Sequence, residues 1–281
     1  MPRLCHICAI RSADSDEHLP GVAAANDGPV EVIYIEPGRS ADNQIKFRRV
    51  IEREGFSVPT LCQHCNARTG GSYGTAYKDF VRQFSLEGLS ATDEKGRALV
   101  ALDGLQPLRV LKQMTAMFLA AQPKLDYERW RPLREFVLRK DARLPAGQLS
   151  FFVYKNVAKT GRIVPMTALG FLRPEPKPAM AVFSELSWPP VGIVFAMEPH
   201  PLLANMADVT HWGEYRFKDR VSLALYIPNL RVETHWPLGF GTPSEVDRWT
   251  EREHVIHFVA EGSDDPDLPT NVGLLFRKTD L

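Results

Sequence analysis

Four cysteines are the residues of this chain whose type and spacing could do chemistry. They form two C-x-x-C pairs, Cys5 with Cys8 and Cys62 with Cys65, which account for every cysteine in the chain. Each C-x-x-C turn places two thiolates on one side, and two turns complete the tetrahedral sulfur shell of a structural Zn²⁺ ion. We therefore expect one zinc ion that ties the first turn to the second and stabilises the region between them.

The two turns allow one alternative to zinc binding. A redox-active C-x-x-C pair has the same spacing. His6 and His64 lie inside the turns, but four thiolates already fill a zinc shell. We expect both histidines to be exposed loop residues and not ligands.

Composition and charge narrow the class of protein. The chain has 281 residues, of which 44% are hydrophobic and 24% charged, as in soluble globular proteins. It has no apolar run of the ~18 residues that a membrane span needs, and its start shows no secretory signal. We expect a cytoplasmic protein without a membrane partner. Disulfides seldom persist in the cytoplasm. Lysine and arginine total 34, as do aspartate and glutamate, which argues against a uniformly basic nucleic-acid binder.

A second group of polar residues stands between and after the cysteine pairs. Glu17 and His18 precede Leu19-Pro20, and Asn66 directly follows Cys65. A lone histidine here could simply cap a turn, but the order of motifs resembles the HNH nuclease family of ββα-metal folds. The four-cysteine branch of that family reads C-x-x-C, then (D/E)-H-hydrophobic-P, then L-C-x-x-C-N. LCQHCNARTGG at 61–71 is similar to this ending, and the resemblance covers about residues 3–80.

The resemblance implies a metal-dependent endonuclease that hydrolyses phosphodiester bonds in DNA, with RNA not excluded. In such a site His18 would be the general base that takes a proton from water. Glu17 and Asn66 would hold a catalytic Mg²⁺ or Mn²⁺ through oxygen atoms. The zinc would be a separate, structural ion. Stand-alone HNH proteins occur in mobile elements and antiphage systems, so antiviral defence is the expected setting, by association only.

Several positions depart from the family pattern. Ser57 stands where the family commonly has an asparagine that braces the loop bearing the base, and Thr69 where a lysine is common. Arg68 could contact phosphate instead, and Arg48 and Arg49 are weaker candidates for nucleic-acid contact. Acidic residues such as Glu52 and Glu54 lie close to Arg48 and Arg49 in the sequence. These arginines could therefore equally belong to an ordinary solvent-exposed face.

Two alternatives to the nuclease therefore stay open. The first is a catalytically inactive, HNH-derived zinc module that binds nucleic acid or protein. The second is an unrelated zinc-ribbon adaptor, in which the E-H-L-P and C-N motifs would be coincidental.

The remaining sequence supplies the elements that must position these residues. Hydrophobic patterns predict a strand at 30–36 and helices at 43–55, 76–88, 105–122 and 126–140. From residue 148 onward, short apolar or alternating runs separated by proline, glycine and asparagine predict six to eight antiparallel strands.

We expect an α+β fold with three parts. These are an HNH-like zinc-bound module over residues 1–80, a helical connector over 81–145, and a β-rich domain over 146–281. The sequence gives the β-rich domain no specific role; joining subunits into a homo-oligomer or binding a regulatory ligand are two options.

Overall fold

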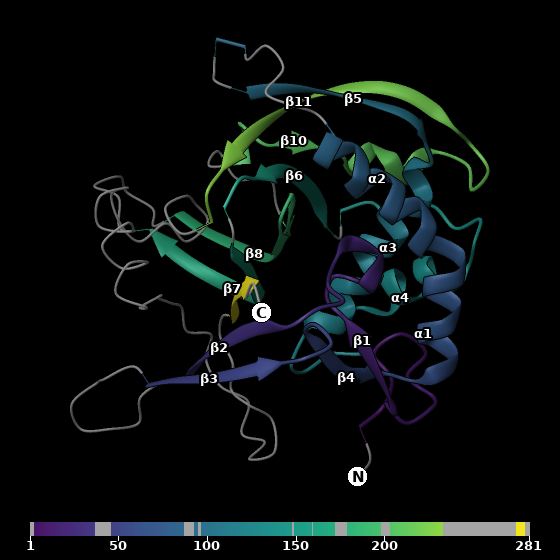
Figure 1. The fold of residues 1–281 in the computed structure, drawn as a ribbon. Coiled ribbons are helices and arrows are strands. Elements are labelled where there is room, and N and C mark those ends of the chain that lie inside the picture. The colour runs from purple at the N-terminus through teal and green to yellow at the C-terminus, as the bar shows by residue number, and fades with distance from the viewer. Residues whose placement is uncertain are drawn as a thin grey trace.

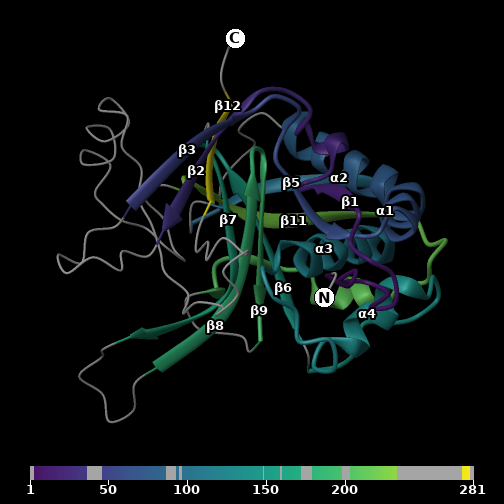
Figure 2. The same ribbon diagram turned by 90° about the horizontal axis from the view of Figure 1, so that it is seen from below.

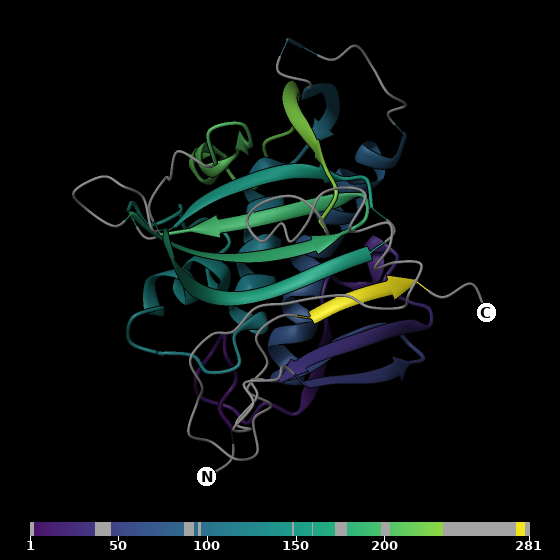
Figure 3. The ribbon, with the colours of Figure 1, turned by 90° about the vertical axis from the view of Figure 1, so that its left-hand side faces the viewer.

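The computed structural model describes residues 3–36, 46–86, 93–94, 97–147, 149–158, 160–171, 179–197, 203–232 and 274–278. The fold is of the α+β class, as the sequence predicts. The helices gather on one face of a large sheet (Figures 1 and 2). Seen from its other face, the sheet lies in front of the helices (Figure 3).

The large sheet contains ten of the described strands. Their order is β3-β2-β12-β7-β8-β9-β6-β11-β5, and β10 pairs with β6. All neighbours are antiparallel except β6 and β11, which run parallel where Asn229 lies opposite Lys155. The strands are β2 Val30–Glu36, β3 Lys46–Glu52, β5 Arg97–Leu105, β6 Ser150–Asn156, β7 Thr160–Phe171, β8 Ala179–Trp188, β9 Val191–Ala196, β10 Ala207–Asp208, β11 Val221–Leu230 and β12 Leu274–Lys278.

The strands confirm the β-rich character of the C-terminal half, because the seven strands β6 to β12 all follow residue 148. The sheet also draws on the rest of the chain. The hairpin β2–β3 joins the sheet through β12, and β5 joins it by pairing with β11. The domain boundaries predicted at residues 80 and 145 stay predictions. Strands from all three predicted parts of the chain pair within this one sheet.

The helix predicted over 43–55 is wrong. Within the described residues this segment is strand β3, which forms a hairpin with β2 in the register Val32 opposite Val50. The β-branched pair Val50-Ile51 favours a pleated strand, and hairpin pairing with the confirmed strand at 30–36 outweighs the loose helical spacing.

The helices form one layer beside the sheet. Three follow one another without a break, α1 Gln63–Thr69, a π-helix Gly70–Gly74 and α2 Thr75–Leu86, and two come later, α3 Pro107–Ala121 and α4 Arg131–Leu138. The helices predicted at 76–88 and 105–122 are confirmed as α2 and α3 over the described residues, and residues 87–88 lie outside them. Helix α4 is shorter than the predicted 126–140, because residues 127–130 form a turn and the helix ends at Leu138. Among the described residues, no helix is long and apolar enough to cross a membrane.

Helix α3 lies at the centre of the packing. All its residues from Leu108 to Ala120 except Arg109 are buried, which fits a helix with neighbours on every side. Phe118 packs against Phe195 of β9, with ring centroids 5.0 Å apart, and against Trp130, at 5.3 Å. The end of this helix also reaches the cysteine cluster described below.

An ion pair between Arg162 and Glu185 is buried within the sheet. Arg162 Nε lies 2.6 Å from Glu185 Oε2, and the two side chains are 4% and 0% exposed. Arg162 Nη1 also donates to Val232 O at 2.6 Å, and the Tyr154 hydroxyl donates to Glu185. Each charge is therefore compensated inside the core.

Removing one partner of this pair should be costly. Glu185→Ala leaves the Arg162 guanidinium buried without its counter-charge, which is expected to lower the free energy of unfolding by ~3–5 kcal/mol. The exposed pair of Arg131 and Glu128, 57% and 76% exposed, provides the control, and Glu128→Ala should cost less than ~1 kcal/mol. Urea unfolding measures both, and equal losses in the two variants would contradict the expectation.

Candidate functional site

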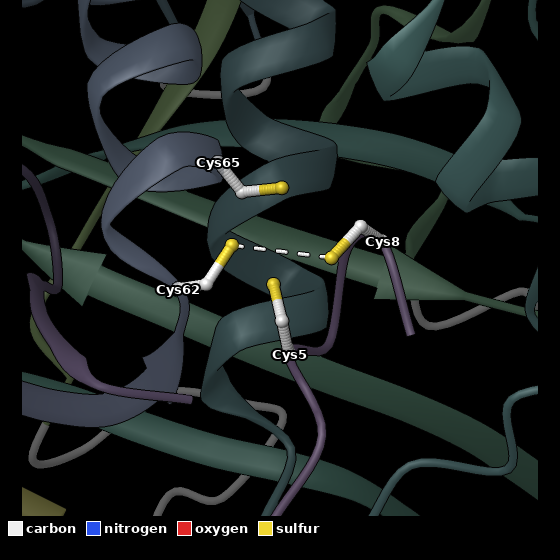
Figure 4. Close-up of side chains that lie close together, drawn as sticks. All are labelled: Cys5, Cys8, Cys62 and Cys65. Atoms are coloured by element: carbon white, nitrogen blue, oxygen red, sulfur yellow. Dashed lines mark hydrogen bonds between the residues drawn. The ribbon is translucent and has the colours of Figure 1, made fainter. Parts of the chain in front are cut away.

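The four cysteines converge on one point. Cys5 and Cys8 come from the N-terminal turn, Cys62 immediately precedes α1, and Cys65 lies in its first turn (Figure 4). Their sulfur atoms all lie within 4.8 Å of one another, and those of Cys8 and Cys62 are 3.9 Å apart. Tetrahedral zinc with Zn–S bonds of ~2.3 Å separates its sulfurs by about 3.8 Å. The cluster therefore has the donor set and size of a Zn²⁺ site, and none of the four cysteines forms a disulfide.

Cysteines of the cluster shift one another's pKa. A hydrogen bond from the Cys65 thiol is the main cause that lowers the pKa of Cys5 to about 4. The same bond raises the pKa of Cys65, and burial raises that of Cys62. Since Zn²⁺ binds thiolates, zinc binding at these four cysteines would release protons from the cluster.

The first cysteine turn is packed against the end of α3, so the expectation that His6 is exposed is wrong. His6 is buried, and its Nδ1 lies 2.9 Å from Leu119 O. Burial lowers the pKa of His6, which favours a neutral ring that donates this bond through Nδ1–H. Thr60 continues the contact by donating to Ala120 O at 2.9 Å. His64 is exposed as expected, and neither histidine belongs to the sulfur cluster.

Helix α4 and the turn before it hold the same segment from another side. Arg134 Nε donates to Ile7 O at 2.9 Å, and Ile7 lies between the two cysteines of the turn. The hydroxyl of Tyr127 donates to Leu4 O at 2.7 Å. These bonds connect the candidate zinc site to the helical layer.

Next to the cluster, a strand pair leads directly into α1. Strand β1 (Ser15–His18) is antiparallel to β4 (Ser57–Leu61), with Glu17 opposite Val58 and His18 opposite Ser57. Cys62 and then α1 follow β4 without a loop. Glu17 and His18 thus stand at the end of β1, while Asn66 is carried by the helix that the cysteines fix.

The amide of Asn66 binds the strand that bears Glu17 and His18. Asn66 Nδ2 donates to Ser15 Oγ and to Asp16 O, both at 2.9 Å. Both amide hydrogens are used in these bonds, so Oδ1 is the atom left for a cation. The structure therefore brings Asn66 to the peptide bond that precedes Glu17.

Glu17 is a buried carboxyl group. It is 5% exposed, and no hydrogen bond or ion pair of its carboxyl group is found within the described part of the chain. Burial raises its pKa to about 8. No cationic group of the described residues compensates it, and a buried acid with a raised pKa is a candidate metal-binding or catalytic group.

His18 is oriented by a main-chain carbonyl. Its Nε2 lies 2.9 Å from Glu54 O. A carbonyl only accepts hydrogen bonds, so Nε2 carries the hydrogen and Nδ1 of the neutral ring carries the lone pair. His18 Nδ1 is therefore the atom that can accept a proton.

The arginines predicted to contact nucleic acid are not gathered in one place. Arg68 lies on α1, but its guanidinium donates to Leu138 O at the end of α4. Arg48 and Arg49 lie on the edge strand β3 of the large sheet, where Arg49 pairs with Glu31 at 3.6 Å. The structure brings the four cysteines together and places Asn66 against β1. Arg68 shares α1 with Asn66 but is bonded to the end of α4, and Arg48 and Arg49 lie on β3.

Two residues of this site carry no sequence signal. The carbonyl of Glu54 holds His18, and Asn26 joins the segments on either side, as described below. Every residue type has a main-chain carbonyl, so the sequence cannot show that the carbonyl of Glu54 contacts His18. Asn26-Asp27-Gly28 is typical of an ordinary turn. Gly55 has a φ of +88°, a conformation that favours glycine, but the sequence places this residue at the end of the helix predicted over 43–55.

Comparisons with known proteins add no family to this geometry. No protein-family model, curated protein or solved structure matches the chain. The four-cysteine cluster thus stands on its own geometry as a candidate zinc site, and the likeness to HNH nucleases rests on the motif residues alone.

Proposed function

We propose that this protein is an HNH-type, metal-dependent endonuclease that hydrolyses phosphodiester bonds in DNA. The observation that carries the proposal is the contact between the cysteine-fixed helix and β1. Through it, the amide of Asn66 meets the strand that ends in the buried Glu17 and the carbonyl-bound His18. The antiparallel pair of β1 and β4, which leads directly into α1 beside the four-cysteine cluster, also supports a ββα-metal arrangement.

The chemistry follows from the groups at this site. His18 Nδ1 takes a proton from a water molecule as the water oxygen bonds to phosphorus and the phosphorus–oxygen ester bond breaks. The bond to Glu54 O keeps the imidazole in the tautomer that this step needs. Glu17 and Asn66 Oδ1 would hold a Mg²⁺ or Mn²⁺ ion, which would neutralise the negative charge on the leaving oxygen until that oxygen takes a proton from solvent.

Two observations favour a second candidate, an inactive module that binds nucleic acid or protein without cutting. Ser57 lies opposite His18 in the strand pair, where the nuclease family commonly has asparagine. Arg68 is already bonded to Leu138 O and would have to leave it to reach phosphate. A setting in antiviral defence and a role of residues 146–281 in joining subunits or binding a regulatory ligand stay predictions.

His18→Ala tests the nuclease. Loss of a general base is expected to reduce the rate of plasmid cleavage with Mg²⁺ or Mn²⁺ by about 10²–10⁴-fold. His64→Ala changes an exposed histidine of the same module and should leave the rate unchanged. The assay compares supercoiled plasmid with single- and double-stranded RNA to identify the substrate.

Two outcomes would redirect the interpretation. Equal cleavage by wild type and His18→Ala would show that His18 is not the base or that another nuclease is present. Absence of cleavage by wild type with either ion, together with a gel shift of DNA, would favour the binding module.

A further inference from the structure

We propose that Asn26 is the positioning residue of His18, and that it takes the bracing role of the asparagine that Ser57 replaces. The inference rests on the proposed function, since it concerns the residue proposed as base. The observation behind this inference differs from the one behind the proposed function. It is a set of hydrogen bonds that joins the segment after His18 to the segment before Ser57.

Asn26 is fully buried, at 0% exposure, and its amide is bonded on both sides. Nδ2 donates to Pro20 O and to Phe56 O, both at 2.8 Å. Oδ1 accepts from the Phe56 N–H at 2.8 Å. Pro20 lies two residues after His18, and Phe56 directly precedes Ser57, so a single side chain fixes both segments.

The turn that carries the His18 partner is shaped around Asn26. Gly55 has a φ of +88°, and a Cβ at this position would lie 2.4 Å from both Asn26 O and Asn26 Oδ1. Only glycine fits such a backbone at so close an approach. The residue before it, Glu54, points its carbonyl at His18 Nε2 at a distance of 2.9 Å.

The consequence concerns the His18 proton. Asn26 holds Phe56 and, through the packed Gly55, the position of Glu54 O. This carbonyl keeps the hydrogen of the neutral ring on Nε2 and leaves the lone pair on Nδ1. A Leu19 N–H bond to Phe56 O at 3.0 Å adds a main-chain link but does not reach the Glu54 turn. Without Asn26 we expect this turn to shift and both tautomers of His18 to be populated.

Asn156 provides a matched control. It is 2% exposed, and its Nδ2 donates to Thr160 O and Ser187 Oγ at 2.9 Å each. Its Oδ1 accepts from the Ala158 N–H at 2.9 Å. Like Asn26, it is buried and uses both its amide nitrogen and its amide oxygen in hydrogen bonds, but it belongs to β6 in the large sheet.

The experiment compares Asn26→Ala with Asn156→Ala in the zinc-loaded full chain. Imidazole ¹⁵N spectra, with the His18 signals assigned by their loss in His18→Ala, report the tautomer across the pH range. Asn26→Ala should show a mixed tautomer and lower kcat by about 10²-fold, the scale of a misplaced catalytic group, with KM unchanged. Asn156→Ala should lose stability but keep the wild-type tautomer and kcat.

Each result supports or overturns the proposal. A wild-type tautomer in Asn26→Ala, or a kcat equal to that of Asn156→Ala, overturns it. If Asn26→Ala does not fold, Asn26→Asp, which keeps the acceptor for Phe56 N–H and removes both donors, is measured in the same way. A wild-type protein that cuts no DNA contradicts the proposed function, and the ¹⁵N spectra alone then decide the role of Asn26.

Discussion

Cys65→Ser is expected to abolish stoichiometric zinc binding and to unfold the segment that holds β1, β4 and α1. The strand pair has only two strands, which are marginally stable without further support. Structural zinc supplies an apparent ~10–16 kcal/mol in zinc-finger peptides at pH 7, and an incomplete sulfur shell forfeits much of it. Metal analysis of the purified protein and thermal unfolding, with and without a chelator, measure the two effects.

The unfolding should extend beyond the cysteine turns. His6 and Thr60 bond to the last carbonyls of α3, and Arg134 of α4 bonds inside the first turn. Hydrogen exchange at the end of α3 should therefore accelerate in Cys65→Ser. His64→Ala, at the exposed neighbouring position, should retain zinc and the wild-type Tm. Full zinc occupancy in Cys65→Ser would remove the cluster from consideration as a four-thiolate site.

The parts of the fold that could be predicted are local. Two C-x-x-C turns specify a tetrahedral sulfur shell regardless of what lies between them, which is why the cluster is confirmed. The long apolar stripe of α3 and the alternating runs after residue 148 likewise contain their own signal. Partner choice is different, because the pairing of β2 with β12 or of β1 with β4 depends on distant segments.

The predictions that were wrong also depend on contacts with distant segments. The β-branched residues around Val50 favour a strand, but the pairing with β2 decides the outcome, and the residues of this segment do not specify that partner. His6 is buried because the end of α3 lies over the first turn, which the sequence of the turn does not reveal. At the candidate site, motif order predicts Glu17, His18 and Asn66, which stay predictions, whereas Asn26 and the carbonyl of Glu54 form hydrogen bonds that no motif contains.

Glu17→Gln is expected to have opposite effects on stability and on activity. The folded protein holds the Glu17 pKa at about 8, against an ordinary value of 4.5. Between these values the unfolded carboxyl is ionised while the folded one stays protonated, so the stability of the wild type falls as pH rises through this window. Glutamine, neutral at every pH, avoids this loss. Without added Mg²⁺ or Mn²⁺, the variant should match wild type near pH 4 and exceed it by a few kcal/mol at pH 9.

Activity should change in the other direction, because only the ionised carboxylate can hold a hard cation. Glu17→Gln is expected to lose Mn²⁺ binding by calorimetry and cleavage of plasmid, even though it is the more stable protein at pH 9. Asp16→Asn, at the exposed neighbouring position of the same strand, should change neither property. A carboxyl group retained only for packing would give the gain in stability with unchanged cleavage, and that result would remove Glu17 from the proposed metal site.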